Sequence, residues 1–362
     1  MRAFALFAAC FCFDFLASAK APFLHETGSV PDETLEVRFV SRDVGWCRTT
    51  DGLYRTTDAG KHWSPVKGPP GDGYNHIWQF QFLDPDTGWV RTTLGPLFWT
   101  HDAGRTWVET PTPFTSGAVP SRGLVEDVRF ASTKIGWLLA LREVPGDPLS
   151  LIRYRMAGEH SVYVPVLFRT MDGGHTWIEA PYPDLKGMPD RLEFADAIHG
   201  ISIELNATLY TRDGGQSWHK SRYCADVDTT RLRRAWPGTG MFAATTAQLL
   251  DASLGLWSVE GDLFRTSDGG ATWRRLPPIR WHKKSLRIGE IRFVNQRLGW
   301  ALPPIDEELA HPTPAPCFQT EDGGETWVAV GMPDDACIEG MTVTKDGTVY
   351  VWGDRQLYLI VV

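Results

Sequence analysis

Residues 263–273 read LFRTSDGGATW, and five further stretches of the chain repeat this pattern. The copies are LYRTTDAGKHW at 53–63, LFWTHDAGRTW at 97–107, LFRTMDGGHTW at 167–177, LYTRDGGQSW at 209–218 and CFQTEDGGETW at 317–327. In each copy an alternating stretch leads into Asp-Gly-Gly or Asp-Ala-Gly, followed by Thr, Ser or, once, His62, and then by Trp. This order is typical of two β-strands joined by a tight turn.

The turn itself explains each residue type in the motif. The aspartate can accept hydrogen bonds from N–H groups of its own turn, the second glycine can adopt a positive φ at low cost, and the tryptophan offers a large ring for burial. Catalysis requires unlike groups that converge at one place, whereas six equivalent turns on a ring lie far apart. We therefore expect six structural aspartates: Asp58, Asp102, Asp172, Asp213, Asp268 and Asp322.

A second signature precedes most of these turns. It consists of an apolar-polar-Phe stretch followed by Gly-Trp, with the Trp seven residues after the Phe. Copies are VRFVSRDVGW at 37–46, FQFLDPDTGW at 80–89, VRFASTKIGW at 128–137 and IRFVNQRLGW at 291–300, with a weaker LEFADAIHGI at 192–201. Each unit therefore contains four short strands, and the motif aspartates recur at intervals of 41 to 70 residues. Units of this kind are typical of propeller blades.

The last residues supply a further unit that lacks the Asp-Gly-Gly turn motif. The stretch 338–362 contains three strand-like segments, and residues 22–30 can provide the missing fourth strand. Pairing of the two ends closes the ring and removes exposed sheet edges. The sequence therefore predicts an all-β fold, a seven-bladed β-propeller that forms a single domain over residues 20–362.

The motif Ser/Thr-x-Asp-x-Gly-x-Thr-Trp is the Asp-box, or BNR repeat, of sialidases, two-propeller xyloglucanases and sortilin-type receptors. Together with the Gly-Trp signature, the chain most resembles the photosystem II stability/assembly factor family and its non-photosynthetic bacterial relatives. The resemblance implies structural Asp-boxes that lie away from the ligand face, and a basic patch on one face. The third unit departs from the pattern by a long insertion, and the fifth lacks a clean Phe…Gly-Trp copy.

The first residues, MRAFALFAACFCFDFLASA, predict a secretory signal peptide at 1–19 that is cleaved after Ala19. We therefore expect a secreted or periplasmic protein, and no later segment is apolar enough to span a bilayer. Four cysteines follow the signal, and two of them, Cys317 and Cys337, fall on neighbouring units where a disulfide could form. Cys47 and Cys224 are expected to stay unpaired with each other.

Several classes of function lack sequence support. There is no Cys-x-x-Cys after the signal and no His-Glu-x-x-His, so we expect no metal and no cofactor. The net charge is −8 and no basic block occurs, so nucleic acid is not an expected partner.

Antiparallel topology divides the connections between two ends of the ring. The Asp-box turns and the turns between first and second strands share one end, and the remaining connections share the other, the loop face. Loops on a rigid scaffold commonly bind ligands, although long insertions can also be merely tolerated. Length variation falls at 109–125, 140–164, 245–261, 275–287 and 303–316, and the insert 143–161 carries the interface-type cluster Arg153, Tyr154 and Arg155.

The first strand of each unit carries a repeated polar pattern. Residues i and i+2 of a strand share a face, so several units place an acid beside a base near the central channel. The pairs either satisfy each other as ion pairs or form a polar channel mouth in which Arg38, Arg129 and Arg292 bind a partner. The pairs are Glu36/Arg38, Asp127/Arg129, Arg191/Glu193 and Glu290/Arg292, with Gln79/Gln81 in the second unit.

These patterns favour a non-catalytic scaffold that binds a protein partner through its loop face. The alternative is a glycan-binding protein or a sialidase-like glycoside hydrolase, although no Arg-Ile-Pro motif occurs and only one propeller fits the chain. Two carboxylates at glycosidase spacing would support the alternative. Candidate acids are Glu126, Asp127, Glu143, Asp306, Glu307 and Glu308, and candidate stacking aromatics are Tyr74, Trp78, Trp257 and Trp281.

Overall fold

The computed structural model describes residues 22–70, 76–93, 96–114, 123–144, 162–182, 189–204, 207–223, 246–259, 262–303, 316–333 and 336–361. All helical or strand structure in these ranges is β-strand. Within them, no helix has the length and apolarity needed to cross a membrane. The predicted signal at 1–19, Cys224 and the cluster Arg153, Tyr154 and Arg155 lie outside the described residues.

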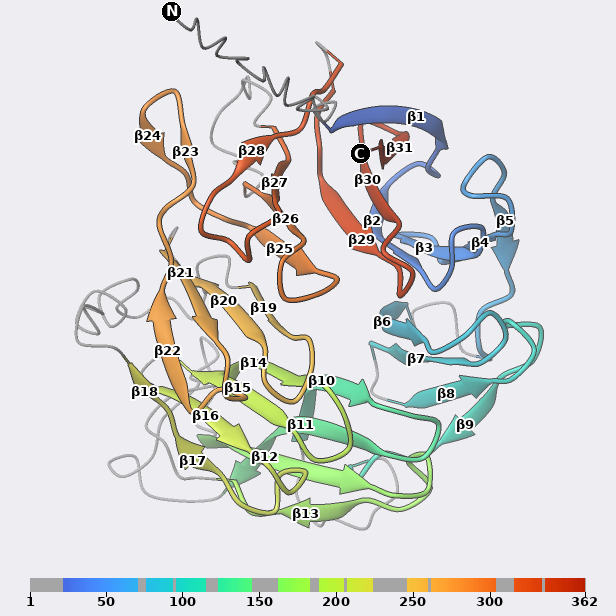
Figure 1. Ribbon diagram of the computed structural model, residues 1–362. Helices are drawn as coiled ribbons and strands as arrows, with labels where there is room; N and C mark the ends of the chain where they lie inside the picture. Colours follow the sequence, from blue (N-terminus) through green and yellow to red (C-terminus); the bar gives the residue numbers. More distant parts are fainter. Residues whose placement is uncertain are drawn as a thin grey trace, which may run out of the picture.

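Seven antiparallel sheets are arranged around a common axis as the blades of a propeller (Figure 1). Blade 1 comprises β2 (Thr34–Phe39), β3 (Gly45–Thr49), β4 (Leu53–Thr56) and β5 (Ser64–Val66). Blade 2 comprises β6 (Ile77–Phe82), β7 (Gly88–Thr92), β8 (Leu97–Thr100) and β9 (Val108–Thr110). Blade 3 comprises β10 (Gly123–Phe130), β11 (Gly136–Val144), β12 (Val162–Thr170) and β13 (Ile178–Ala180). Blade 4 comprises β14 (Pro189–Phe194), β15 (Gly200–Glu204), β16 (Ala207–Thr211) and β17 (His219–Lys220).

Blade 5 comprises β19 (Thr246–Leu249), β20 (Gly255–Val259), β21 (Asp262–Thr266) and β22 (Thr272–Arg275), and β18 (Arg222–Tyr223) joins β22 in parallel as a fifth strand. A short hairpin of β23 (Arg280–Trp281) and β24 (Lys284–Ser285) precedes blade 6. Blade 6 comprises β25 (Glu290–Phe293), β26 (Gly299–Leu302), β27 (Phe318–Thr320) and β28 (Val328–Ala329). Blade 7 comprises β29 (Gly340–Val343), β30 (Val349–Gly353), β31 (Gln356–Val361) and β1 (Phe23–Ser29).

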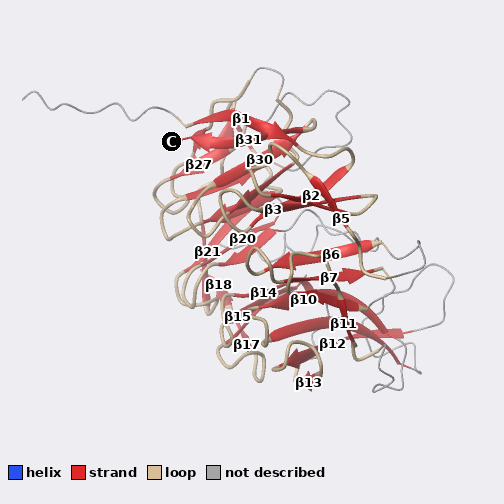
Figure 2. Cartoon of the chain, turned by 90° about the vertical axis from the view of Figure 1, so that its right-hand side faces the viewer, coloured by secondary structure: helices blue, strands red, loops and turns tan. Residues whose placement is uncertain are grey.

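The two ends of the described chain close the ring. β1 pairs antiparallel with β31, from Phe23 opposite Val361 to Ser29 opposite Gln356. β1 buries Leu24, and Val30 just beyond it is buried as well. The predicted seven-bladed fold, closed by strands from both termini, is confirmed, and Figure 2 shows the ring from the side.

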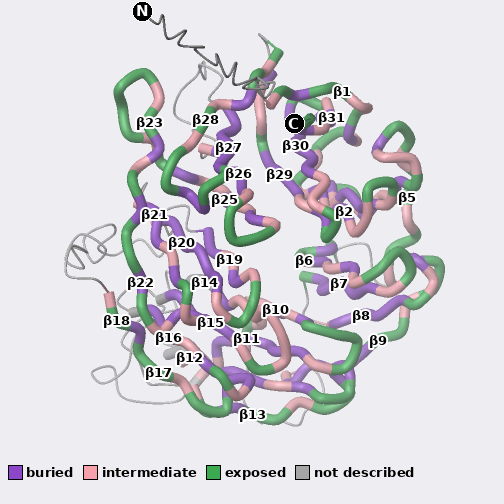
Figure 3. The backbone as a smooth tube through the Cα atoms, viewed as in Figure 1, coloured by how far each residue is buried: buried purple, intermediate pink, exposed green. Residues whose placement is uncertain are grey.

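The hydrophobic core lies in layers between neighbouring blades, where the buried segments of Figure 3 concentrate. The Phe…Gly-Trp signature builds these layers. The Phe39 ring covers Gly45 of its own blade, and a Cβ added at Gly45 would lie 2.7 Å from that ring. The Trp46 ring stacks on Phe82 of the next blade, with ring centroids 3.6 Å apart. The glycine thus makes room for one ring while the tryptophan binds the following blade.

Blade 5 corrects one prediction. Residues 245–261 were expected as an expanded loop, but the structure has β19 and β20 there. Leu249 replaces the usual Phe and lies near Gly255, while Leu256 replaces the usual Trp. Because smaller apolar residues fill the same positions, the strand pair forms although the aromatic signature is missing. The loop expected at 140–164 is also shorter, since β11 runs to Val144 and β12 starts at Val162.

The cysteines also differ from the expectation. Cys47, Cys317 and Cys337 are free thiols, so the disulfide considered between Cys317 and Cys337 is absent. Cys317 is fully buried in the layer between blades 6 and 7, and its Sγ contacts the Phe318 carbonyl oxygen at 3.9 Å. Burial raises the pKa of the Cys317 thiol well above its ordinary range, so it acts as a small core residue.

Candidate functional site

Each Asp-box carboxylate is occupied by its own turn. In the fifth copy, Asp268 accepts hydrogen bonds from the Thr266 hydroxyl at 2.8 Å, the Thr272 N–H at 2.8 Å and the Thr272 hydroxyl at 2.7 Å. The same three contacts recur in the second copy, where the bonds from Thr106 are the main cause that lowers the pKa of Asp102 to about 2. In the first copy His62 replaces the hydroxyl residue, with Nδ1 at 2.6 Å from Asp58.

Each Asp-box turn also docks on the first turn of its own blade. The N–H of the residue after the aspartate donates to a carbonyl oxygen of that turn, as Gly269 does to Ser253 and Gly323 does to Arg297, both at 2.8 Å. The two kinds of turn therefore share one end of the ring, the Asp-box face, and the loop face is opposite. Asp58, Asp102, Asp172, Asp213, Asp268 and Asp322 all lie on the Asp-box face, each hydrogen-bonded within its turn.

The innermost strands bring the predicted acid–base pairs together around the axis. Arg38 Nε lies 2.5 Å from Glu36 Oε1, and Arg292 Nη2 lies 2.8 Å from Glu290 Oε1. Burial alone would raise the pKa of Glu36, but Arg38, together with Arg48 and Arg129, outweighs it and lowers that pKa. The Glu36 carboxylate is therefore ionised at neutral pH, and its arginine neighbours neutralise it.

Arg129 connects three blades electrostatically. Its Nε lies 3.4 Å from Asp127 Oδ2, and its Nη2 lies 3.6 Å from Glu193 Oε1 of blade 4. Burial alone would lower the pKa of Arg129, but Asp127, Glu193 and the more distant Glu36 of blade 1 outweigh it and raise that pKa. The arginine therefore acts as a charged link between blades. The side chain of Arg191, the base expected beside Glu193, lies outside the described atoms.

Neutral side chains link the inner strands elsewhere. Gln81 of blade 2 donates to the Phe130 carbonyl at 3.2 Å and accepts from the Phe130 N–H at 3.3 Å. Gln248 of blade 5 makes the same two contacts with Phe293 of blade 6, at 3.0 and 2.7 Å. In blades 2 and 5 the glutamine just before the signature Phe, or before Leu249 in its place, thus satisfies the backbone of the next blade, which supports a structural role for this position.

Four blades carry a β-bulge at the loop-face end of the innermost strand. The register shifts between Thr34 and Glu36, between Ile77 and Gln79, between Val125 and Asp127, and between Pro189 and Arg191. A bulge inserts one unpaired residue and can re-aim its side chain. The side chain of Asp190, inserted in blade 4, lies outside the described atoms. The other inserted residues are Leu35, 52% exposed, Trp78, 61% exposed, and the exposed Glu126. We call these three residues the axial mouth.

Behind the mouth lies a cation that the sequence analysis did not identify. Arg91 of β7 is only 5% exposed, and its Nη2 donates to the Glu126 carbonyl oxygen at 3.4 Å. Burial lowers the pKa of Arg91 to about 10, against the opposing effect of Asp127 and Glu126. Although Glu126 reaches solvent, the protein around it removes part of its hydration, and this desolvation raises its pKa despite Arg91.

The remaining candidate aromatic and acidic residues of the loop face do not form a common site in the described part of the chain. Trp257 is 3% exposed in the core of blade 5, so its ring presents no binding surface. Trp281 is half-buried and forms a T-shaped ring pair with Phe318. Glu143 is half-buried near the end of β11. Four further candidates lie outside the described residues: Tyr74, Asp306, Glu307 and Glu308. No group of three or more His, Cys, Asp or Glu side chains that could hold a metal ion occurs in the described ranges.

The sequence matches one repeat family model and is similar to one curated enzyme. Residues 209–220 match the family model described as BNR/Asp-box repeat. The xyloglucanase Xgh74A of Acetivibrio thermocellus is 24% identical over 309 residues, which cover 72% of this chain and 35% of that protein. The chain therefore spans about a third of the length of this curated relative.

Solved structures give matches over nearly the whole chain. The structure of YCF48 bound to D1 peptide has a TM-score of 0.58 at 14% identity and covers 95% of this chain and 97% of that one. YCF48 from Cyanidioschyzon merolae has a TM-score of 0.54 at 16% identity and covers 94% and 98%. At such identities the likeness concerns the fold. The chain is a seven-bladed β-propeller of the Asp-box (BNR-repeat) type, similar in fold to YCF48.

Proposed function

We propose that this protein is a non-catalytic scaffold that binds a protein partner, through a peptide segment, at the axial mouth on its loop face. The observation that carries the proposal is Trp78, which is 61% exposed although the other tryptophans of the described residues are buried or half-buried. Exposed large apolar groups often mark interaction sites, and tryptophan is enriched among residues that dominate binding energy.

The surrounding charges support binding rather than catalysis. Glu36, Asp127 and Glu290 each have an arginine within 4 Å, so they do not form a free acid and base pair. The similar structure of YCF48 bound to D1 peptide shows that a propeller of this fold can hold a peptide. The signal predicted at 1–19 supports a secreted or periplasmic location.

The experiment is capture of partners from the native envelope fraction by wild-type protein and by a Trp78→Ala variant. Loss of a tryptophan anchor should weaken a specific interaction by about tenfold or more. Ile178→Ala is the matched control, because Ile178 is 69% exposed on the outermost strand of blade 3. If the Trp78→Ala and Ile178→Ala variants capture the same proteins equally well, the partner does not bind at the axial mouth.

A second candidate is a glycan-binding protein or glycoside hydrolase. It is favoured by the raised pKa of Glu126, which adjoins Asp127 and belongs with Trp78 to the axial mouth, and by the likeness to a xyloglucanase. A raised pKa suits a general acid, and an indole ring can stack on a sugar. Release of reducing ends from xyloglucan by wild type, abolished in the Glu126→Gln variant, would establish this candidate, whereas the scaffold proposal predicts that wild type releases none.

A further inference from the structure

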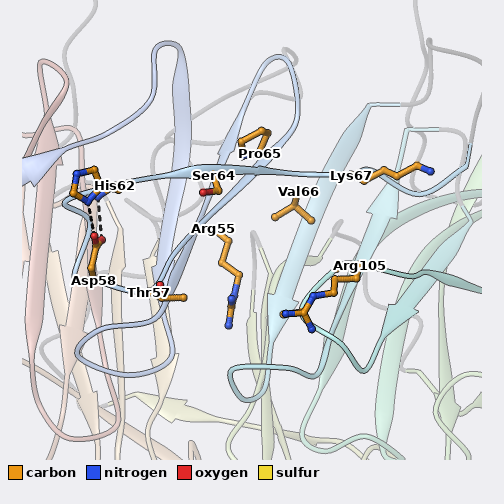
Figure 4. A pocket seen from close by; sticks show the side chains of 11 residues that line it. Arg55, Thr57, Asp58, His62, Ser64, Pro65, Val66, Lys67 and Arg105 are labelled. Carbon is orange, nitrogen blue, oxygen red and sulfur yellow. Dashed lines mark hydrogen bonds and ion pairs between the residues drawn. The ribbon is translucent and has the colours of Figure 1, made fainter.

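A groove of about 520 Å³ lies between blades 1 and 2, on the side of the Asp-box turns and remote from the axial mouth (Figure 4). One wall is formed by β4, β5 and the Asp-box turn of blade 1. The other wall is formed by the Asp-box turn of blade 2. Its charged and titratable lining consists of Arg55, Asp58, His62, Lys67 and Arg105. This volume is in the range of small-molecule sites.

The cations of this groove are only partly satisfied. Arg55 Nη2 donates to the Pro85 carbonyl oxygen at 3.3 Å, but its buried Nε has no partner. Arg105 and Lys67 have no ion pair and no side-chain hydrogen bond within the part of the chain that the structure describes. In Figure 4 the Arg105 side chain extends toward Arg55, whereas the Lys67 side chain, which also lines the groove, points away from both arginines.

The single carboxylate among the lining residues is already engaged. Asp58 accepts hydrogen bonds from the Thr56 hydroxyl at 2.9 Å and the His62 N–H at 3.0 Å, and it lies 2.6 Å from His62 Nδ1. In Figure 4 this pair lies at the opposite end of the groove from Arg105. Asp58 therefore does not neutralise the two arginines.

The repeat shows that the fold does not require these cations. The position of Arg105, third after the aspartate, is occupied in the other copies by Lys61, His175, Gln216, Ala271 and Glu325. The residues equivalent to Lys67 in other blades can be identified from the register in which the third and fourth strands of each blade pair. In blades 2 to 5 it is occupied by Pro111, Pro181, Ser221 and Pro277. Among the five grooves between blades 1 and 6, only the groove between blades 1 and 2 therefore has Lys or Arg at both of these positions.

Arg55 differs from these two, because its position has a structural use as well. The equivalent Arg265 of blade 5 donates to Gly323 at 2.9 Å and Gln296 at 3.1 Å, both in blade 6. Arg55 likewise reaches Pro85 of the next blade and lies over the Trp46 ring at 5.5 Å. Variants of Arg55 would therefore perturb blade packing, and Arg105 and Lys67 are the residues to change.

We propose that this groove binds a small anion whose phosphate, sulfate or carboxylate oxygens contact Arg105 and Arg55, with Lys67 elsewhere in the lining. Guanidinium groups match such oxyanions by paired, charge-assisted hydrogen bonds. The chain as a whole carries a net charge of −8, so a local excess of cations concentrates anions here rather than over the whole surface. The site is independent of the partner proposed for the axial mouth.

Isothermal titration calorimetry of the full chain with inorganic phosphate, pyrophosphate and citrate at 150 mM NaCl (roughly physiological ionic strength) tests the proposal. Wild type should bind at least one of these probes. Arg105→Gln should weaken that binding by about tenfold, as expected for loss of one charged hydrogen-bond donor. The double variant Arg105→Gln/Lys67→Gln should lose it. The order of the three probes then distinguishes phosphoryl oxygens from carboxylates.

Lys61→Gln is the matched control, because Lys61 occupies the position of Arg105 in the first Asp-box, outside the groove lining. It should leave binding unchanged. Glutamine is compatible with this position, since Gln216 occupies it in the fourth copy, and equal melting temperatures would verify folding. Absence of binding by wild type to all three probes would overturn the proposal. So would equal losses in Lys61→Gln and Arg105→Gln, which would indicate only diffuse surface charge.

Discussion

Replacing Asp268 by alanine should destabilise the ring while leaving the axial mouth intact. The substitution removes three hydrogen bonds of 2.7 to 2.8 Å from one turn, two from Thr272 and one from Thr266. One of these losses leaves the Thr272 N–H without its acceptor. The backbone bond from Gly269 to Ser253 remains, so the turn should stay docked on the first turn of blade 5.

The expected loss is about 1–2 kcal/mol of unfolding free energy. Each hydrogen bond contributes about 0.5–1.5 kcal/mol net, but water replaces part of the loss because the turn lies at the surface. Removal of a comparable side-chain cap from a helix costs about 0.5–2 kcal/mol. For a ring of this size the loss corresponds to a melting temperature lower by about 1–3 °C.

Differential scanning calorimetry and partner capture measure the two effects separately. Asp268→Asn should lie between wild type and Asp268→Ala, because the amide oxygen can still accept from the Thr272 N–H. Partner capture should be unchanged at temperatures where both proteins are folded. If Asp268→Ala melts like wild type, or if it loses its partner while folded, the structural role of the Asp-boxes is refuted.

Three further predictions test other parts of the fold. Deletion of residues 22–30 should lower the melting temperature of the whole ring, because it removes β1 and exposes the layer that Leu24 covers; an unchanged melt would contradict closure by β1. Gly299→Ala should destabilise blade 6 by about 1–3 kcal/mol, because its Cβ would lie 2.6 Å from the Phe293 ring, and a native-like urea midpoint would disprove this account of the signature. The hydrogen bonds from Thr326 outweigh burial and lower the pKa of Asp322 to about 2, so its stabilisation is present above pH 4 and is lost as the pH falls toward 2. The stability difference between wild type and Asp322→Ala should therefore shrink in that range, and a constant difference in urea unfolding would exclude the ionised carboxylate as its cause.

Local patterns in the sequence were sufficient to predict the blades. The Asp-box and the Phe…Gly-Trp signature each lie within about eleven residues, and their turns and strand pairs form through contacts inside one blade, such as Asp268 with Thr272 and Phe39 with Gly45. The pairing of both ends also followed from the sequence, because the last unit lacked one strand. The first two strands of blade 5 were not predicted, because Leu249 and Leu256 replace the aromatic residues of the signature. Leucine can be buried at these positions as the aromatic residues are in other blades.

Contacts between blades, in contrast, were decided by the tertiary structure. The i, i+2 spacing predicted that Arg129 would meet Asp127, but not that it would also reach Glu193 of blade 4. The bulge that exposes Trp78 is a shift in pairing register, and no sequence pattern near Trp78 predicted that shift. The groove brings Arg55 and Arg105 together from two blades. The sequence determined the turns and strands because their interactions are local, whereas the candidate sites required the closed ring that sets which residues of different blades meet.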